Sequence, residues 1–311
     1  MKKIAVVIPC FNEEGNIMPM YERLKKAFKN LSYEYNFIYV NNGSTDESDK
    51  TFRKLAEKDK KVNVIYLSRN FYKSQGAYTA GIDYTDADAV VLIDGDIQDP
   101  PEKIPELIKK WDEGYDIVYG VRIKRKGSRF RRFAYKAFYR IFQKASYINM
   151  PLDAGDFSLI DRKIVDILKQ MPERNRYIRG LRAWVGFKSI GVPYIRDERH
   201  RGLTTNSLID NINWAFFAIF SFSYAPLGLI SWLAFFTVVL SAVAIVIYTV
   251  LYFLYPGAPR GFQTLLLAVL FLGSVQLICF SILAQYQGIM FDEIKKRPKY
   301  IVEKVLNGKS A

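Results

Sequence analysis

The strongest constraint on this chain is a long, almost uncharged segment near its C-terminal end. Residues 214–290 contain one charged side chain, Arg260, in 77 positions. A membrane-spanning helix needs roughly 20 predominantly apolar residues, so the segment has room for two spans and a turn. We expect a first span at 228–255, a turn at 256–260 and a second span at 263–290.

The apolar residues before the first span are too few to cross a bilayer. Residues 214–227 could form a third span only if 14 positions sufficed, which falls short of the roughly 20 required. We expect interfacial amphipathic helices at 207–227 instead, with Trp214 at the headgroup level. Two spans then leave the body, 1–206, and the tail, 291–311, on the same side of the membrane.

Charge indicates which side that is. The chain has 45 Lys and Arg against 31 Asp and Glu, a net charge of +14, and the excess lies in the body and the tail. Such an excess favours anionic partners. Positive segments flanking spans remain cytoplasmic, so we expect a multi-pass protein of the cell inner (plasma) membrane with both termini in the cytoplasm. With only Cys10, Cys279 and His200, the composition excludes a disulfide framework and a His-rich metal site.

The body alternates between short apolar strands and amphipathic helical patterns. Strand-like runs occupy 4–9, 37–40, 62–67 and 89–93, and helical spacing fills 14–30. This alternation predicts an α/β fold with a mostly parallel sheet of the nucleotide-binding type. Ligands of such sheets bind at the carboxyl ends of the strands.

A polar cluster follows each of three predicted strands, at 9–14, 41–46 and 94–101. One such cluster alone is typical of a turn with helix caps, but three at one sheet edge favour a shared binding site. The third contains Asp94, Asp96 and Gln98, whose oxygens suit Mg²⁺ or Mn²⁺ shared with substrate phosphates.

Basic residues gather in two further places. Residues 122–144 hold ten Lys and Arg among aromatic side chains and no acid. This composition fits nucleic acid, a solvated helix face or an anionic leaflet, and the apolar hairpin favours anionic membrane lipids over nucleic acid. Arg176 and Arg179 would share a face if helical, as a clamp on phosphate; the alternative is surface ion pairing.

Four segments carry a resemblance to a known family: IPCFNEE, VNNGSTDES, LIDGDIQDPPEKIP and AGDFSLIDRKIV. They resemble family 2 glycosyltransferases of the GT-A fold. Together with the two apolar spans, they resemble the polyprenyl-phosphate glycosyltransferases, which include bactoprenol glucosyltransferases and dolichyl-phosphate mannose synthase. The resemblance covers nearly the whole chain.

The resemblance implies roles for individual residues. It assigns nucleotide binding to Pro9, Phe11, Glu13, Asn42 and Asp94, metal binding to Asp96 and Gln98, and catalysis to Asp156, Asp94 and Asp96, with Asp156 at the position of the proposed base. Lys73 belongs to the same motifs and is expected to bind phosphate. Arginine chemistry and position, rather than the resemblance, predict that phosphate or lipid-phosphate binding also involves Arg122, Arg176, Arg179 and Arg199. Two departures stand out. Asn42 replaces the usual Asp, and a Lys usual after Gly202 is absent.

The expected reaction is metal-dependent, inverting transfer of a sugar, glucose above others, from a UDP-sugar to polyprenyl (undecaprenyl) phosphate at the cytoplasmic face. Transfer of GlcNAc, mannose or another sugar, processive polysaccharide synthesis, an inactive assembly subunit and a membrane-anchored nucleic-acid-binding protein are the alternatives. Gly273 and Ser274 could let spans of a homo-oligomer pack closely.

Overall fold

The computed structural model describes residues 1–123, 146, 148, 151, 154–174, 176–197, 216, 219–254 and 261–308. Its strands are β1 (Lys3–Cys10), β2 (Glu34–Asn41), β3 (Val62–Leu67), β4 (Ala89–Leu92), β5 (Ile117–Arg122), β6 (Ala154–Asp161), β7 (Ser189–Tyr194) and β8 (Val302–Leu306). Its helices are α1 (Glu14–Phe28), α2 (Ser48–Lys58), α3 (Ser74–Asp83), the short η1 (Pro101–Lys103), α4 (Ile104–Asp112), α6 (Arg162–Gln170), α7 (Ile178–Trp184), α9 (Ala225–Leu254) and α10 (Phe262–Lys295).

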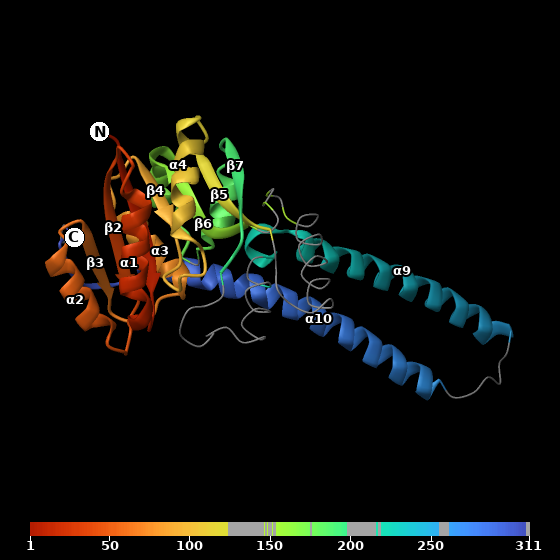
Figure 1. The fold of residues 1–311 in the computed structure, drawn as a ribbon. Coiled ribbons are helices and arrows are strands. Elements are labelled where there is room, and N and C mark those ends of the chain that lie inside the picture. Colours follow the sequence, from red (N-terminus) through yellow and green to blue (C-terminus); the bar gives the residue numbers. More distant parts are fainter. Residues whose placement is uncertain are drawn as a thin grey trace.

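The strands form one eight-stranded sheet in the order β7-β5-β6-β4-β1-β2-β3-β8. The pairs β1/β2, β1/β4, β2/β3 and β5/β7 are parallel, while β6 and β8 run antiparallel to their neighbours. The mostly parallel α/β sheet predicted from the alternating pattern is therefore confirmed. Figure 1 shows this sheet and its helices as a head from which α9 and α10 project.

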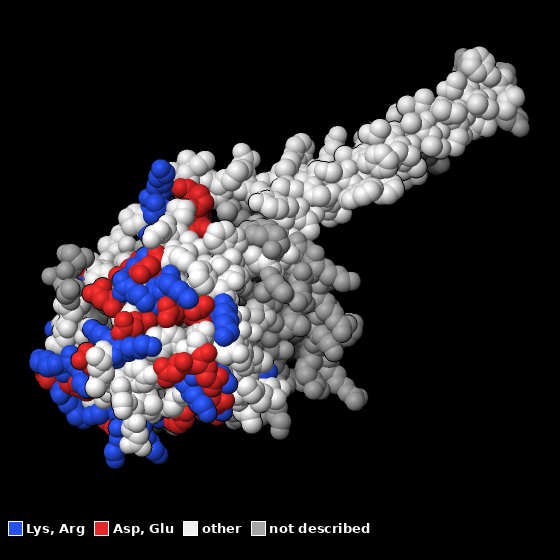
Figure 2. Space-filling view, turned by 90° about the horizontal axis from the view of Figure 1, so that it is seen from above, with Lys and Arg blue, Asp and Glu red and all other residues white. Residues whose placement is uncertain are grey.

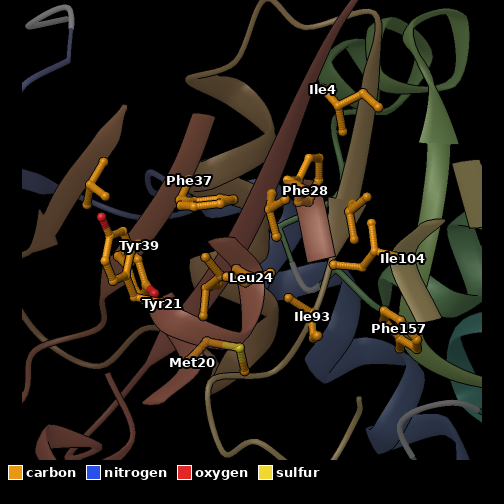
Figure 3. Close-up of a cluster of buried hydrophobic side chains, with 14 of the residues drawn as sticks. Ile4, Met20, Tyr21, Leu24, Phe28, Phe37, Tyr39, Ile93, Ile104 and Phe157 are labelled. Atoms are coloured by element: carbon orange, nitrogen blue, oxygen red, sulfur yellow. The ribbon is translucent and has the colours of Figure 1, made fainter. Parts of the chain in front are cut away.

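The sheet is covered on both faces, which explains why its central strands are continuous apolar runs. On β1, Ile4, Val6 and Ile8 pack with α1 in one core cluster. Ala5 and Val7 point to the other face and pack with α3. Figure 3 shows the first cluster, in which Met20, Leu24 and Phe28 of α1 lie against strand side chains.

The antiparallel direction of β6 matters most for the site. Because β6 runs against β4, the start of β6 lies at the edge where β1, β2 and β4 end. The register pairs Leu92 with Ser158, so the residues just beyond this pair, Asp94 and Asp156, come to the same edge. Two segments about sixty positions apart in the chain thus meet.

Helices α9 and α10 are long and apolar enough to cross a membrane. The qualifying stretches are Ala225–Leu251 and Thr264–Lys295, and the most apolar part of each has a mean hydropathy of 2.5 and is not buried within the protein. Helix α9 begins slightly before the expected span because Pro226 sits in its first turn, where a missing N–H costs nothing. Figure 2 shows charged side chains over the head, whereas the part of the hairpin that projects from it is white in this view. Of the predicted interfacial segment, 207–227, the structure describes residues 216 and 219–227, and the last three of these belong to α9.

A strand occupies part of the segment expected to be only a basic tail. After α10 the chain returns to the head, and β8 pairs antiparallel with β3 at the end of the sheet. The Ser68 N–H donates to the Ile301 carbonyl at 3.0 Å, and Lys304 pairs with Asp49 at 3.2 Å. The C-terminal end of the hairpin is thereby attached to the head.

Candidate active site

The loops that follow β1, β2 and β4 hold one another at the carboxyl edge of the sheet. The Asn12 N–H donates to Ser44 Oγ at 3.0 Å, and the Thr45 N–H donates to Asn12 Oδ1 at 2.7 Å. The Gly95 N–H donates to the Pro9 carbonyl at 3.2 Å. The three polar clusters therefore lie together, as their places after the strands predicted.

Asn42 uses its whole side chain to hold the loop before α3. Its Oδ1 accepts from the Phe71 N–H at 2.9 Å, and its Nδ2 donates to Asn70 Oδ1 at 3.2 Å and to the Lys73 carbonyl at 2.6 Å. Asn42 is 2% exposed. The amide expected to meet a nucleotide base is thus already engaged in shaping the loop that carries Lys73, whose φ is +54°.

The other residues expected at the nucleotide lie around the end of β1. Pro9 is buried within the strand, and Phe11 just beyond it is partly exposed. Glu13 is buried, and its carboxylate accepts from the Asn16 side chain. Phe11 is therefore the more accessible of these side chains.

Carboxylates crowd the loop after β4. The Tyr78 hydroxyl donates to Asp94 Oδ1 at 2.8 Å. Burial and the nearby charges of Asp96, Asp156 and Asp99 raise the pKa of Asp94 to about 7. Asp96 Oδ1 accepts from the Gln98 N–H at 3.2 Å. This edge concentrates negative charge, which is suited to a cation.

Asp156 is held by an arginine fork. It is 5% exposed, and Arg179 donates to its two oxygens at 3.0 and 3.1 Å. Burial alone would raise the pKa of Asp156, but Arg179, assisted by Arg182 and Arg122, outweighs burial and holds that pKa below its usual value. Arg182 in turn donates to the Gly155 carbonyl at 3.0 Å. Asp156 is thus ionised at neutral pH and paired with the Arg179 fork.

Asp99 forms a second, buried centre of charge. It is fully buried, accepts from the Tyr194 hydroxyl, and lies 3.6 Å from Arg122 Nη2 and 3.5 Å from Arg196 Nε. Arg122 Nε also donates to the Tyr194 oxygen at 3.0 Å. Arg196 reaches further, to 3.7 Å from Asp96 Oδ2. Asp99 therefore anchors two arginines beside the acidic loop.

Arg176 lies elsewhere. It precedes α7, is 3% exposed, and donates through Nη2 to the Leu168 carbonyl in α6. The expected face shared with Arg179 does not form, because the helix begins only at Ile178. Arg199 and most of the basic run, 124–144, lie outside the described residues.

Residues 5–168, which extend from β1 into α6, match the family described as Glycosyl transferase family 2. The chain belongs to glycosyl transferase family 2.

Two relatives of this family 2 glycosyltransferase extend over nearly the whole chain. The uncharacterized glycosyltransferase YkcC of Bacillus subtilis (strain 168) is 40% identical over 304 residues, 96% of this chain and 93% of the relative. The SfII prophage-derived bactoprenol glucosyl transferase of Shigella flexneri is 37% identical over 310 residues, 98% of this chain and 99% of the relative.

Among solved structures, glucosyl-3-phosphoglycerate synthase of Mycobacterium tuberculosis, crystallised with Mn²⁺, UDP-glucose and phosphoglyceric acid, is similar with a TM-score of 0.45 and 20% identity. The match covers 71% of this chain and 79% of that one. A likeness at this level supports no statement about ligands.

The donor set of the family 2 glycosyltransferase fits a cation shared with a substrate. Within the described part of the chain, no three Asp, Glu, His or Cys side chains gather as a complete metal site. Asp96 and Gln98 instead offer a carboxylate and a carboxamide, part of a coordination shell. Mg²⁺ and Mn²⁺ commonly accept such partial sites when phosphate oxygens fill the remainder. A positive charge, that of Arg196, already lies 3.7 Å from Asp96.

Several residues of the site were not predicted. Asp99 stands inside the acidic segment and Arg182 inside the arginine cluster, so their motifs contained a signal. Tyr78, Tyr194 and Arg196 lie in other elements, and nothing in their sequence surroundings pointed to the acidic loop.

Proposed function

We propose that this family 2 glycosyltransferase transfers glucose from UDP-glucose to a polyprenyl phosphate at the cytoplasmic face of the plasma membrane. The observation that carries the proposal is the meeting of the acidic β4 loop, Asp94 and Asp96, with the Asp156–Arg179 pair at one sheet edge. Two apolar helices extend from the same head. The bactoprenol glucosyl transferase name of a 37% identical, full-length relative supports the acceptor and the sugar.

Different residues of the site would bind the two anionic substrates, the nucleotide diphosphate and the acceptor phosphate. Asp96 and Gln98 would hold Mg²⁺ or Mn²⁺, which supplies charge neutralisation for the departing diphosphate. Phe11 lies where a nucleoside would enter, at the end of β1. Arg122, held by Asp99 and Tyr194, and Arg179, held by Asp156, present guanidinium groups to phosphate oxygens.

The acceptor needs little help to become a nucleophile. A phosphate monoester has a second pKa of about 6 and is mostly a dianion at pH 7. Its oxygen would attack the anomeric carbon directly, the bond to the nucleotide diphosphate would break, and the configuration would invert. The main task of the protein is to hold two anions close together, which explains why Asp156 orients an arginine and need not remove a proton.

The orientation of the protein is part of the proposal. The Lys and Arg excess of the head and tail supports a cytoplasmic head with both termini on that side. Anionic lipids would then face the basic residues near the hairpin.

Radiolabelled transfer tests the proposal. Purified protein in detergent is given undecaprenyl phosphate and, in turn, UDP-glucose, UDP-GlcNAc and GDP-mannose, with Mn²⁺, Mg²⁺ or EDTA. We expect one glucose per lipid, lost with EDTA. The Asp96→Ala variant should lose at least about 100-fold in rate, whereas Glu57→Ala, an exposed change near the far end of α2, should not.

Other results would contradict parts of the proposal. Activity of Asp96→Ala within a few-fold of wild type would remove the metal assignment. Transfer from UDP-GlcNAc or GDP-mannose instead of UDP-glucose would contradict the proposed identity of the sugar. Growth of a polymer would indicate a processive synthase. Salt-sensitive DNA binding without any sugar transfer would favour a nucleic-acid-binding protein.

A further inference from the structure

Helix α7 carries the two arginines that hold the start of β6. Arg179 binds the Asp156 carboxylate, and Arg182 donates to the carbonyl of Gly155. Gly180 lies between them, and because it has no side chain its backbone packs directly against the ring of Phe222. A Cβ built on Gly180 would lie 2.4 and 2.5 Å from two ring carbons of Phe222. The helix and the ring are therefore in the closest packing that the backbone permits.

Phe222 belongs to the base of the membrane hairpin. It stands three residues before α9 and is 4% exposed, with its ring 6.2 Å from that of Tyr177. The next residue, Ser223, accepts through its carbonyl from the Tyr286 hydroxyl of α10 at 2.7 Å. The residues around this ring are thus joined to both helices of the hairpin.

A second connection reaches the segment before α7. The Arg174 N–H donates to Glu293 Oε1 near the end of α10 at 2.8 Å, and Lys299 Nζ donates to the Met171 carbonyl at 2.6 Å. The segment that leads into α7 is therefore fixed to α10, while α7 itself rests on Phe222.

We propose that the Gly180–Phe222 contact is a joint through which the membrane hairpin sets the position of Arg179 and Arg182 for the phosphate of a membrane-bound acceptor. Gly180 and Phe222 are positioning residues, and this inference rests on the proposed function. A lipid phosphate is held at a fixed height by its chain, while the nucleotide sugar arrives from water. Arg179 and Arg182, whose helix is fixed to the hairpin, are therefore the residues that must lie at the same depth relative to the membrane as the acceptor phosphate.

Close packing makes such a joint stiff. Interiors packed at this density transmit displacement between neighbouring groups, and a misplacement of about 1 Å at a positioning group can cost roughly 100-fold in rate. A methyl group on Gly180 must push the Phe222 ring, the Tyr177 ring or α7 itself, because Tyr177 Cδ1 also lies 2.8 Å from the built Cβ.

The test compares the KM values of the two substrates in Gly180→Ala, Phe222→Leu and the double variant, with UDP-glucose and undecaprenyl phosphate in liposomes. In Gly180→Ala we expect the KM of undecaprenyl phosphate to rise about tenfold, with the KM of UDP-glucose within about twofold. Leucine lacks the two ring carbons that the methyl group would strike, so the double variant should recover most of the loss. Gly288→Ala is the matched control, since a Cβ on Gly288 meets nothing within 4 Å.

Several results would overturn the joint. These are equal KM changes for the two substrates, no recovery in the double variant, or an unchanged acceptor KM in Gly180→Ala. If Gly180→Ala does not fold, Phe222→Leu decides alone: the joint requires about a threefold rise in acceptor KM with the donor KM unchanged. Wild-type protein that fails to transfer glucose to undecaprenyl phosphate would instead refute the proposed function.

Discussion

Replacing Asp156 with Asn tests whether this carboxylate orients an arginine or removes a proton. The carboxamide keeps the shape of the side chain but offers Arg179 one acceptor oxygen in place of two at 3.0 and 3.1 Å. A hydrogen bond to a charged group contributes about 1.5–3 kcal/mol. Because Arg179 is 25% exposed, water recovers part of this, and we take about 2 kcal/mol, or roughly a 30-fold loss of kcat/KM.

The pH dependence separates the two roles. The pKa of Asp156 is lowered in the folded protein by Arg179 and its neighbours, which overcome burial. A lowered pKa means that the carboxylate is ionised above the usual value of about 3.9 and loses its charge only as the pH falls through its folded pKa. Between pH 5.5 and pH 8 its own charge is therefore constant. Removing that charge also lowers the pKa of Asp94, which is about 7 in the wild type and is raised partly by Asp156. Asp94 then stays ionised to lower pH in the variant, so the loss in Asp156→Asn should be no larger at pH 5.5 than at pH 8.

The assay is kcat/KM for transfer to undecaprenyl phosphate at five pH values, in wild type and Asp156→Asn. The acceptor phosphate titrates near pH 6 in both reactions, so its effect cancels in the ratio of the two rates. A ratio that grows more than about threefold from pH 8 to pH 5.5 would show that Asp156 takes a proton, and would refute the orienting role. Thermal unfolding of both proteins confirms that the variant is folded.

Three further changes probe the surroundings. Gly95→Ala places a methyl group 2.7 Å from a β1 carbonyl oxygen and should cost about 1–3 kcal/mol of stability, measured by urea unfolding; unchanged stability would contradict that packing. Tyr194→Phe removes a hydrogen-bond donor to the fully buried Asp99 and should lower the free energy of unfolding by about 1–3 kcal/mol in the same urea experiment. A urea midpoint equal to that of the wild type would contradict a stabilising Tyr194–Asp99 hydrogen bond. Arg196→Gln removes a positive charge 3.7 Å from Asp96. Mn²⁺ alone should therefore bind about fivefold more tightly, a gain of about 1 kcal/mol, which electron paramagnetic resonance measures. Weaker binding of Mn²⁺ would show that Arg196 does not compete with the cation at Asp96.

The central part of the fold was predictable because its physics is local. Strands β1 to β4 are buried on both faces and must be apolar runs, so their positions follow from hydropathy alone. The polar clusters follow the ends of these strands, so the sequence predicts that the acidic loop and Asn42 lie at one edge of the sheet. The two long apolar helices were equally predictable, since a long uncharged segment is what a helix that crosses a membrane requires.

The rest depended on tertiary contacts that no local pattern records. Strand β8 is a short run with two charged residues, and only its pairing with β3 makes it a strand. Arg176 and Arg179 are the same residue type three positions apart, yet one enters the interior near α6 and the other binds Asp156. Asn42 was predicted to bind a base, and nothing in the sequence indicated its partners in the structure, which come from a loop almost thirty residues away.

The place of β8 has a consequence for how the protein is made. Translation produces β8 after both hairpin helices, yet its partner β3 is among the first strands to leave the ribosome. In the proposed topology, the edge of β3 therefore stays unpaired while α9 and α10 enter the bilayer, and the head is completed only once the chain has returned. Correct insertion of the hairpin would thus become a condition for finishing the sheet, so a chain that fails at the membrane would keep an open strand edge on which another chain can pair.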